Sequence, residues 1–178
     1  MKAFVISIIA LLISVSAFAQ EDFSRNEISV NLGSFLFLYP EISFERLLTE
    51  DIGIGTSLGF GLGNGRRNFN FTPFARMYFG NSREGFRFRP GTGFFIEINS
   101  SFYSFRYDWW EDFYNEGYWH WGDRQSENRF DIGVGVAIGW KFLSRNNRTG
   151  ELLLGFGRGA INEYSFYPRV GISFGRRF

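Results

Sequence analysis

The chain has 178 residues, a formal net charge of +1 at pH 7 and no cysteine. A nearly neutral charge balance argues against nucleic acid as a partner, and a chain without cysteine carries neither disulfides nor a lipid-modified cysteine. Phenylalanine (24 residues) and glycine (22 residues) are abundant, yet the mean hydropathy is only −0.14. This combination favours apolar residues at every second position over long apolar runs.

Residues 1–19 have the three parts of a secretory signal peptide. Lys2 supplies a positive charge, residues 5–15 are a mostly apolar run, and Ala17-Phe18-Ala19 matches the cleavage pattern of two small residues separated by one other residue. The apolar run is shorter than the roughly 20 residues of a transmembrane helix. We therefore expect cleavage after Ala19, which leaves residues 20–178 as one exported domain.

Eight segments of the remaining chain alternate between apolar residues and small or polar ones, the period of two that is typical of β-strands. The segments cover approximately residues 27–35, 40–48, 51–62, 68–79, 92–104, 129–142, 150–158 and 167–178. In segment 51–62, for example, Ile54 and Leu58 alternate with Gly53 and Gly59. Each segment is long enough to cross a bilayer as a tilted strand. The sequence therefore predicts an all-β protein, an eight-stranded antiparallel up-and-down transmembrane barrel.

In such a barrel the apolar residues face lipid and the small or polar residues face the lumen. A lumen enclosed by eight strands is just wide enough for side chains. Strand parity places charged residues of both signs in it: acidic Glu45, Glu97 and Asp131, with Glu151 as a further candidate, and basic Arg76, Lys141, Arg169 and Arg177. An unpaired buried charge costs several kcal/mol or more. We therefore predict a structural ion-pair network that fills the lumen, with a narrow pore as an alternative.

Residues 105–128 form the longest connection between predicted strands and are unusually aromatic. The candidate surface for a ligand or partner consists of Tyr107, Trp109, Trp110, Tyr114, Tyr118, Trp119 and Trp121. Asn115–Gly117 is predicted to be the turn of a hairpin that projects beyond the membrane. Exposed aromatic residues are enriched in recognition surfaces. The alternative is structural: some rings would belong to the aromatic girdle of a barrel, and others would pack together to stiffen the loop.

The sequence offers little chemistry for catalysis or metal binding. His120 is the only histidine, so it cannot build a site of several histidine ligands, and no nucleophile elbow is present. We predict no catalytic residue, no metal and no cofactor. The alternative is a lipid-modifying enzyme of the outer membrane, a hydrolase or acyltransferase that would use His120 or the lumen carboxylates.

The signal peptide, the eight alternating segments and the last residues together resemble the small OmpA/OmpX-type outer-membrane barrels. The tail from Val170 to Phe178 is similar to the C-terminal signal that such proteins present to the barrel-assembly machinery, with Phe174 and Phe178 as its aromatic residues. Arg176 departs from the pattern, in which an apolar residue is usual two positions before the end. Near the headgroups an arginine costs only about 0–1 kcal/mol.

The resemblance implies a porin-like integral protein of a Gram-negative outer membrane. An even number of strands returns the C-terminus to the side of the N-terminus, so both termini are expected in the periplasm. The implied partners are outer-membrane lipid and lipopolysaccharide, the assembly machinery during biogenesis and an unidentified extracellular ligand. The implied role is adhesion or envelope integrity, served by the outside loops and above all by residues 105–128.

Overall fold

The computed structural model describes residues 24–35, 38–62, 67–80, 89–110, 113–115, 118–120, 124–161 and 166–178; for residues 67 and 107–125 it describes the backbone alone. The predicted signal peptide lies outside these residues. The elements are β1 (Asn26–Asn31), α2 (Leu32–Phe35), β2 (Glu41–Leu47), β3 (Ile52–Phe60), β4 (Arg67–Tyr78), β5 (Gly93–Trp110), β6 (Phe113–Asn115), β7 (Tyr118–His120), β8 (Arg124–Leu143), β9 (Arg148–Gly159) and β10 (Phe166–Arg177).

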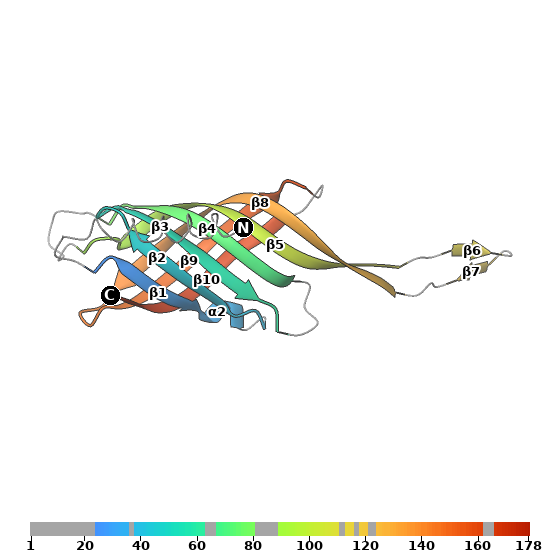
Figure 1. Cartoon of the computed structure of the whole chain (residues 1–178), viewed down its shortest axis with the longest axis horizontal. Helices are drawn as coiled ribbons and strands as arrows, with labels where there is room; N and C mark the ends of the chain where they lie inside the picture. The colour runs from blue at the N-terminus through green and yellow to red at the C-terminus, as the bar shows by residue number, and fades with distance from the viewer. Residues whose placement is uncertain are drawn as a thin grey trace, which may run out of the picture.

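Eight of these strands close one antiparallel barrel in the order β1-β10-β9-β8-β5-β4-β3-β2 (Figure 1). The closure joins the first strand to the last, from Glu27 opposite Arg177 to Asn31 opposite Ser173. Two backbone hydrogen bonds between Asn26 and Phe178, of 3.0 and 2.7 Å, continue this seam. The predicted eight-stranded up-and-down barrel is confirmed. Within the described residues, no helix is both long and apolar enough to cross a membrane.

The two ends of the barrel differ in their connections. Figure 1 shows the C-terminus at the end opposite to the long projection of β5 and β8. At this C-terminal end the backbone amide of Arg177 donates to the carbonyl of Asn147 at 2.8 Å, and its guanidinium donates to the carbonyl of Gly91 at 2.9 Å. The described chain therefore begins and ends at the C-terminal end, and α2 and the projection lie at the other end, which we call the extension end.

The predicted C-terminal end of the first strand is wrong. The strand was expected to continue to residue 35, but β1 ends at Asn31 and a helical turn follows. The side chain of Asn31 accepts hydrogen bonds from the backbone amides of Ser34 and Ile172, both at 3.2 Å. Its amide nitrogen donates to the carbonyl of Val170 at 3.2 Å. This side chain therefore replaces the next ladder contacts to β10 and releases the backbone to turn.

The predicted loop at 105–128 is shorter than expected, because its flanks are paired strands. β5 and β8 remain in register through Phe105 opposite Arg129 and as far as Trp110 opposite Arg124. The strand-forming tendency of their aromatic residues is consistent with this longer ladder. We call residues 106–110 and 124–128, together with β6 and β7, the extension. The predicted hairpin is present, with Asn115 of β6 opposite Tyr118 of β7. The other two residues of the predicted turn, Glu116 and Gly117, lie outside the described residues.

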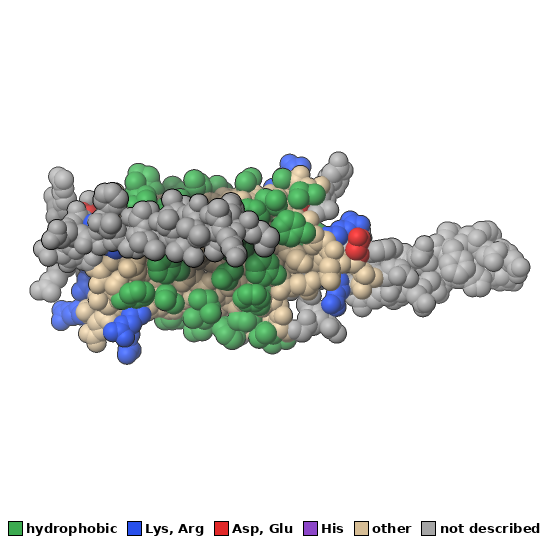
Figure 2. All heavy atoms as spheres, in the orientation of Figure 1, with side chains coloured by type: hydrophobic (Ala, Val, Ile, Leu, Met, Phe, Trp, Pro, Cys, Tyr) green, Lys and Arg blue, Asp and Glu red, His purple; other side chains and the backbone are tan. Residues whose placement is uncertain are grey.

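The faces of the strands follow the predicted alternation. On β9, Leu152 and Leu154 are exposed on the outer wall, whereas Leu153 between them is buried in the lumen. On the face seen in Figure 2, hydrophobic side chains form a band, and basic side chains lie toward both ends of the barrel. The wall is therefore apolar outside and the lumen is largely polar, the reverse of a soluble barrel.

Glycines on the lumen face make room for the large side chains that fill it. A Cβ atom added at Gly157 would collide with the ring of Tyr167, and one added at Gly139 would collide with the ring of Phe95. Phe95 belongs to a small buried cluster at the core of the lumen, whose members are Leu47, Tyr78, Phe95, Ala137 and Leu153. The alternation of glycine with apolar residues thus serves the packing of the lumen as well as the orientation of the wall.

Candidate functional site: the lumen and the extension

Arg76 occupies the centre of the lumen and binds three carboxylates. Its Nη1 lies 2.7 Å from Glu45 and 2.8 Å from Glu151, and its Nε lies 2.8 Å from Glu97. Strand parity directs the side chain inward from β4, and the acids come from the neighbouring strand β5 (Glu97) and from β2 and β9 (Glu45 and Glu151). The guanidinium also stacks on the ring of Phe74, 4.2 Å from its centroid. Arg76 therefore links four strands of the barrel.

Lys141 forms a second centre nearer the C-terminal end. Its Nζ lies 2.5 Å from Glu45, 3.0 Å from Glu27 and 3.2 Å from Glu151. One carboxylate oxygen from each of these glutamates lies within 4.8 Å of the others, an arrangement that could hold a metal ion. The ammonium of Lys141, 1% exposed, contacts all three carboxylates. The positive charge that this cluster requires is therefore supplied by the protein itself.

Two further arginines extend the network toward both ends of the barrel. Arg169 lies 3.0 Å from Glu97 and 2.6 Å from Glu41. Arg177 lies 3.1 Å from Glu27, at the C-terminal end. The contacts form one connected set, which we call the lumen network: Glu27, Glu41, Glu45, Arg76, Glu97, Lys141, Glu151, Arg169 and Arg177.

Neutral donors also stabilise the carboxylates of the lumen network. The hydroxyl of Tyr78 donates to Glu45 at 2.5 Å, and the side-chain amide of Asn99 donates to Glu97 at 3.1 Å. Buried charges are tolerated when ion pairs and hydrogen bonds satisfy them together. At this level the lumen is packed with paired charges and rings, an arrangement suited to holding the walls together.

The structure brings five of the six proposed network residues into direct contact: Glu45, Arg76, Glu97, Lys141 and Arg169. The sixth, Asp131, is fully buried nearer the extension end. Its Oδ1 accepts the backbone amides of Ile132 at 2.8 Å and Ile161 at 3.0 Å, and Tyr103 donates to its Oδ2 at 3.5 Å. Asp131 therefore fastens the chain where it leaves β9.

Sequence reasoning missed two members of the network, Glu27 and Glu41. The signal was available in the alternation, because Ile28 and Ile42 face outward and the residue before each must face inward. Both glutamates lie at the beginnings of their strands, where the predicted boundaries were least sharp. Parity at strand ends would have identified them.

The extension carries the backbone of most proposed recognition residues. Tyr107, Trp109 and Trp110 lie on the projecting part of β5, and Tyr114 lies on β6 opposite Trp119 of β7. Tyr118 begins β7, whereas Trp121 lies outside the described residues. His120 ends β7 opposite Phe113. Figure 1 shows β6 and β7 at the tip of the projection, far from the barrel body. The structure thus separates His120 from the lumen carboxylates.

The proposed assembly residues lie on the outer wall at the seam of the barrel. Phe174 pairs with Val30 on β1 and with Gly150 on β9, and its ring is exposed. Phe178 is also exposed at the end of the chain. Arg176, the departure from the expected tail, faces outward between them.

The closed ring of eight antiparallel strands, the apolar wall and the charged lumen define the fold of a small outer-membrane β-barrel. Among solved structures, the chain is similar to the N-terminal β-barrel domain of OprF from Pseudomonas aeruginosa, with a TM-score of 0.54 and 14% sequence identity. The match covers 89% of this chain and 100% of that domain. At this identity the likeness concerns the fold, and it confirms the expected OmpA-type barrel. Comparisons with protein-family models and with curated protein sequences give no match.

Proposed function

We propose that the chain is an integral, non-enzymatic protein of a bacterial outer membrane that presents the extension as an interaction surface outside the cell. In this proposal the C-terminal end of the barrel faces the periplasm. The observation that carries the proposal is the reversed polarity of the barrel: apolar residues line the outer wall, and the lumen network fills the interior. Contact of such an apolar wall with water would be unfavourable around its whole circumference, whereas contact with the hydrocarbon of a lipid bilayer would be favourable.

The height of the apolar wall supports insertion in a bilayer. On β9 the outward arginines Arg148 and Arg158 bracket an apolar run that includes Leu152 and Leu154. At about 3.3 Å per residue these arginines are about 33 Å apart along the strand. With a strand tilt of about 40° this corresponds to about 25 Å along the barrel axis, the height of the apolar band in outer-membrane barrels.

The lumen network favours a structural barrel over a channel. Arg76 and Lys141 each bind three carboxylates from different walls. An eight-stranded barrel filled in this way leaves little room for bulk water. We expect no stable large conductance in planar bilayers, and a large, reproducible single-channel conductance would favour the pore alternative.

The extension is suited to an interaction role because it projects from one end of the barrel. Its described aromatic residues lie in strands that pair within the extension: the projecting part of β5 pairs with that of β8, and β6 pairs with β7. Adhesion and support of the envelope are the roles that such a projecting, aromatic surface would serve. The two described ends of the chain lie at the opposite end of the barrel, which is consistent with an extension on the outer side.

The test is cell fractionation combined with a heat-modifiability gel, on which a folded barrel migrates differently before and after boiling. We expect the protein in the outer-membrane fraction with a distinct unboiled band. An epitope tag inserted between Asn115 and Tyr118 should be detected on intact cells. Recovery of the protein in a soluble fraction would refute membrane insertion, and a tag detected only after lysis would refute the outward orientation.

Activity on lipid is tested separately through His120. We expect His120→Ala to leave the composition of lipid A unchanged, because the backbone of His120 lies at the tip of the projection, far from the lumen carboxylates. An altered lipid A profile would instead favour the lipid-modifying enzyme.

A further inference from the structure

We propose that the outer wall at the C-terminal end binds one anionic glycerophospholipid, with Arg148 and Arg176 holding its phosphate and an apolar groove receiving an acyl chain. This inference rests on the proposed membrane insertion. Its starting point is a pair of like charges: Arg148 on β9 stands directly opposite Arg176 on β10. Like charges in this relationship destabilise a sheet unless something neutralises them.

Within the described residues, neither arginine has a neutralising partner. Both side chains are exposed on the outer wall. The acids of the barrel interior are directed to Arg76, Lys141 and the other lumen bases, and neither Arg148 nor Arg176 shares a hydrogen bond or ion pair with a described side chain. Two free guanidiniums side by side can each donate hydrogen bonds to different oxygens of the same phosphate group.

A notch leads from the arginine pair toward the middle of the wall. The next outward position on β9 is Gly150, which lies between Phe142 of β8 and Phe174 of β10. Nothing lies within 4 Å of the place that a Cβ atom of Gly150 would occupy. The wall therefore lacks a side chain between two exposed aromatic residues, immediately beside the two charges.

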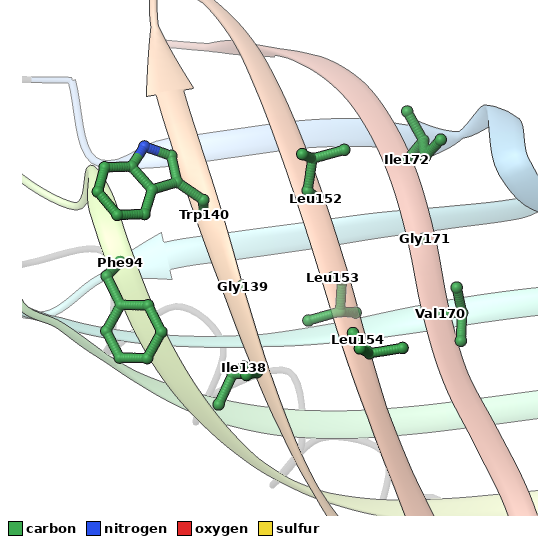
Figure 3. Close-up of a pocket in the computed structure, with 10 residues that line it drawn as sticks. All are labelled: Phe94, Ile138, Gly139, Trp140, Leu152, Leu153, Leu154, Val170, Gly171 and Ile172. Atoms are coloured by element: carbon green, nitrogen blue, oxygen red, sulfur yellow. The ribbon is translucent and has the colours of Figure 1, made fainter.

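One outward position beyond Gly150 on β9 is Leu152, which lines an apolar groove of about 370 Å³. Leu152 is flanked in register by Trp140 and Ile172. Figure 3 shows Trp140 and Phe94 on one side of the groove, Ile172 on the other, and Leu152 between them. A pair of arginines at the membrane edge, with an unfilled position and then an apolar groove beyond it on the same strand, matches the order of groups in a phospholipid: an anionic headgroup joined to hydrocarbon.

The charge selects the class of lipid. In a zwitterionic lipid, the ammonium group of the headgroup already balances the charge of the phosphate. In an anionic lipid such as phosphatidylglycerol, the phosphate charge is not balanced within the headgroup and can neutralise the arginines. The other end of the same strand provides a contrast, because Arg158 stands opposite the apolar residues Val134 and Phe166. Arg158 is thus a matched single arginine on the same wall without a paired cation.

The experiment is native mass spectrometry of the protein purified in detergent and mixed with equal amounts of phosphatidylglycerol and phosphatidylcholine. We expect one phosphatidylglycerol per barrel, retained about tenfold more than phosphatidylcholine, as a difference of one charge-assisted contact would give. The double variant R148Q/R176Q should reduce this preference about tenfold, and Arg158→Gln should leave it unchanged. An unchanged preference in R148Q/R176Q, or an equal loss in Arg158→Gln, would overturn the site.

Two substitutions at Gly150 test the notch independently of charge. Gly150→Phe should lower phosphatidylglycerol retention several-fold by filling the notch, whereas Gly150→Ala should retain most of it; equal retention in both variants would overturn the path of the acyl chain. Every sample is first examined on a heat-modifiability gel. A wild-type protein without a folded band would refute the membrane barrel, whereas a folded wild-type barrel without lipid preference would refute only the phospholipid site.

Discussion

Arg76 of β4 and Glu97 of β5 stand directly opposite each other in the sheet, and the Nε of Arg76 donates to Glu97 at 2.8 Å. The same carboxylate, which is 0% exposed, also accepts a hydrogen bond from Arg169 of β10 at 3.0 Å. Glu97 therefore belongs both to a pair between neighbouring strands and to a bridge across the lumen. Through this shared acid, local strand pairing and closure of the barrel become parts of one network.

Removal of the central cation should therefore be severe. In Arg76→Met the carboxylates of Glu45, Glu97 and Glu151 lose their common partner while they stay buried. Breaking one side of a buried ion pair costs about 3–5 kcal/mol. We expect the free energy of unfolding to fall by this amount, measured by urea titration of the protein folded into lipid vesicles.

The control is Arg129→Met. Arg129 lies 3.3 Å from Glu127, and the two side chains are 41% and 55% exposed. An exposed pair contributes about 0–1 kcal/mol, so this variant should unfold close to the wild-type midpoint. Equal losses in the two variants would mean that the lumen network contributes no more than a surface contact.

A second prediction concerns the glycines of the lumen face. Gly157→Ala places a methyl group into the ring of Tyr167, which is itself buried and donates to Asn99 at 2.8 Å. Overpacking of this kind costs about 1–3 kcal/mol. We expect this loss in the same urea titration, together with a weaker folded band on unboiled gels.

The matched control lies on the same strand but on its outer face. Gly150→Ala meets no atom within 4 Å, and alanine limits the unfolded chain more than glycine does. This variant should be as stable as the wild type or slightly more stable. If Gly157→Ala were equally harmless, Tyr167 would have to move freely in the lumen, and the interpretation of these glycines as packing sites would fail.

The sequence was sufficient to predict which residues face the lipid and which face the lumen, but not which residues contact one another across the lumen. Alternation fixes the face of a residue, so Arg76, Glu97 and Lys141 could be placed inside from parity alone. Partners depend also on height along the axis and position around the ring, which parity does not contain. The bridge between Arg169 on β10 and Glu41 on β2 spans two strands that are not neighbours, and no local pattern predicts it.

The ends of the strands were the second feature that the sequence did not predict correctly. The end of β1 depends on the side chain of Asn31, whose contacts reach to Val170 and Ile172, far along the chain. The length of β5 depends on a partner strand that begins at Arg124, beyond the hairpin. Both boundaries are set by tertiary pairing, and a reading along one segment at a time could not locate them.

The lipid-facing wall provides a third prediction. Leu154 is 62% exposed near the middle of the apolar run on β9. An arginine at the midplane of the bilayer costs about 2–4 kcal/mol, so we expect Leu154→Arg to lower the free energy of unfolding in vesicles by this amount. Leu154→Phe, which keeps the wall apolar, should change it little.

The same pair of variants distinguishes lipid from water outside the wall. In a soluble protein, a leucine with this exposure could be replaced by arginine almost without cost. Equal stability of Leu154→Arg and Leu154→Phe would therefore contradict insertion in a bilayer, whatever the fold.

The last prediction separates recognition from structure in the extension. Trp109 and Trp110 lie where β5 pairs with β8 beyond the last registered contact of β5 with β4, at Phe105. Their replacement by alanine should leave the urea midpoint and the folded band unchanged, because the barrel closes without them. Tyr103→Ala, a buried lumen ring two positions before Phe105, should cost about 3–5 kcal/mol. If the tryptophan double variant lost its folded band as well, the extension would be a structural part of the barrel, and its aromatic residues could not be assigned to a partner.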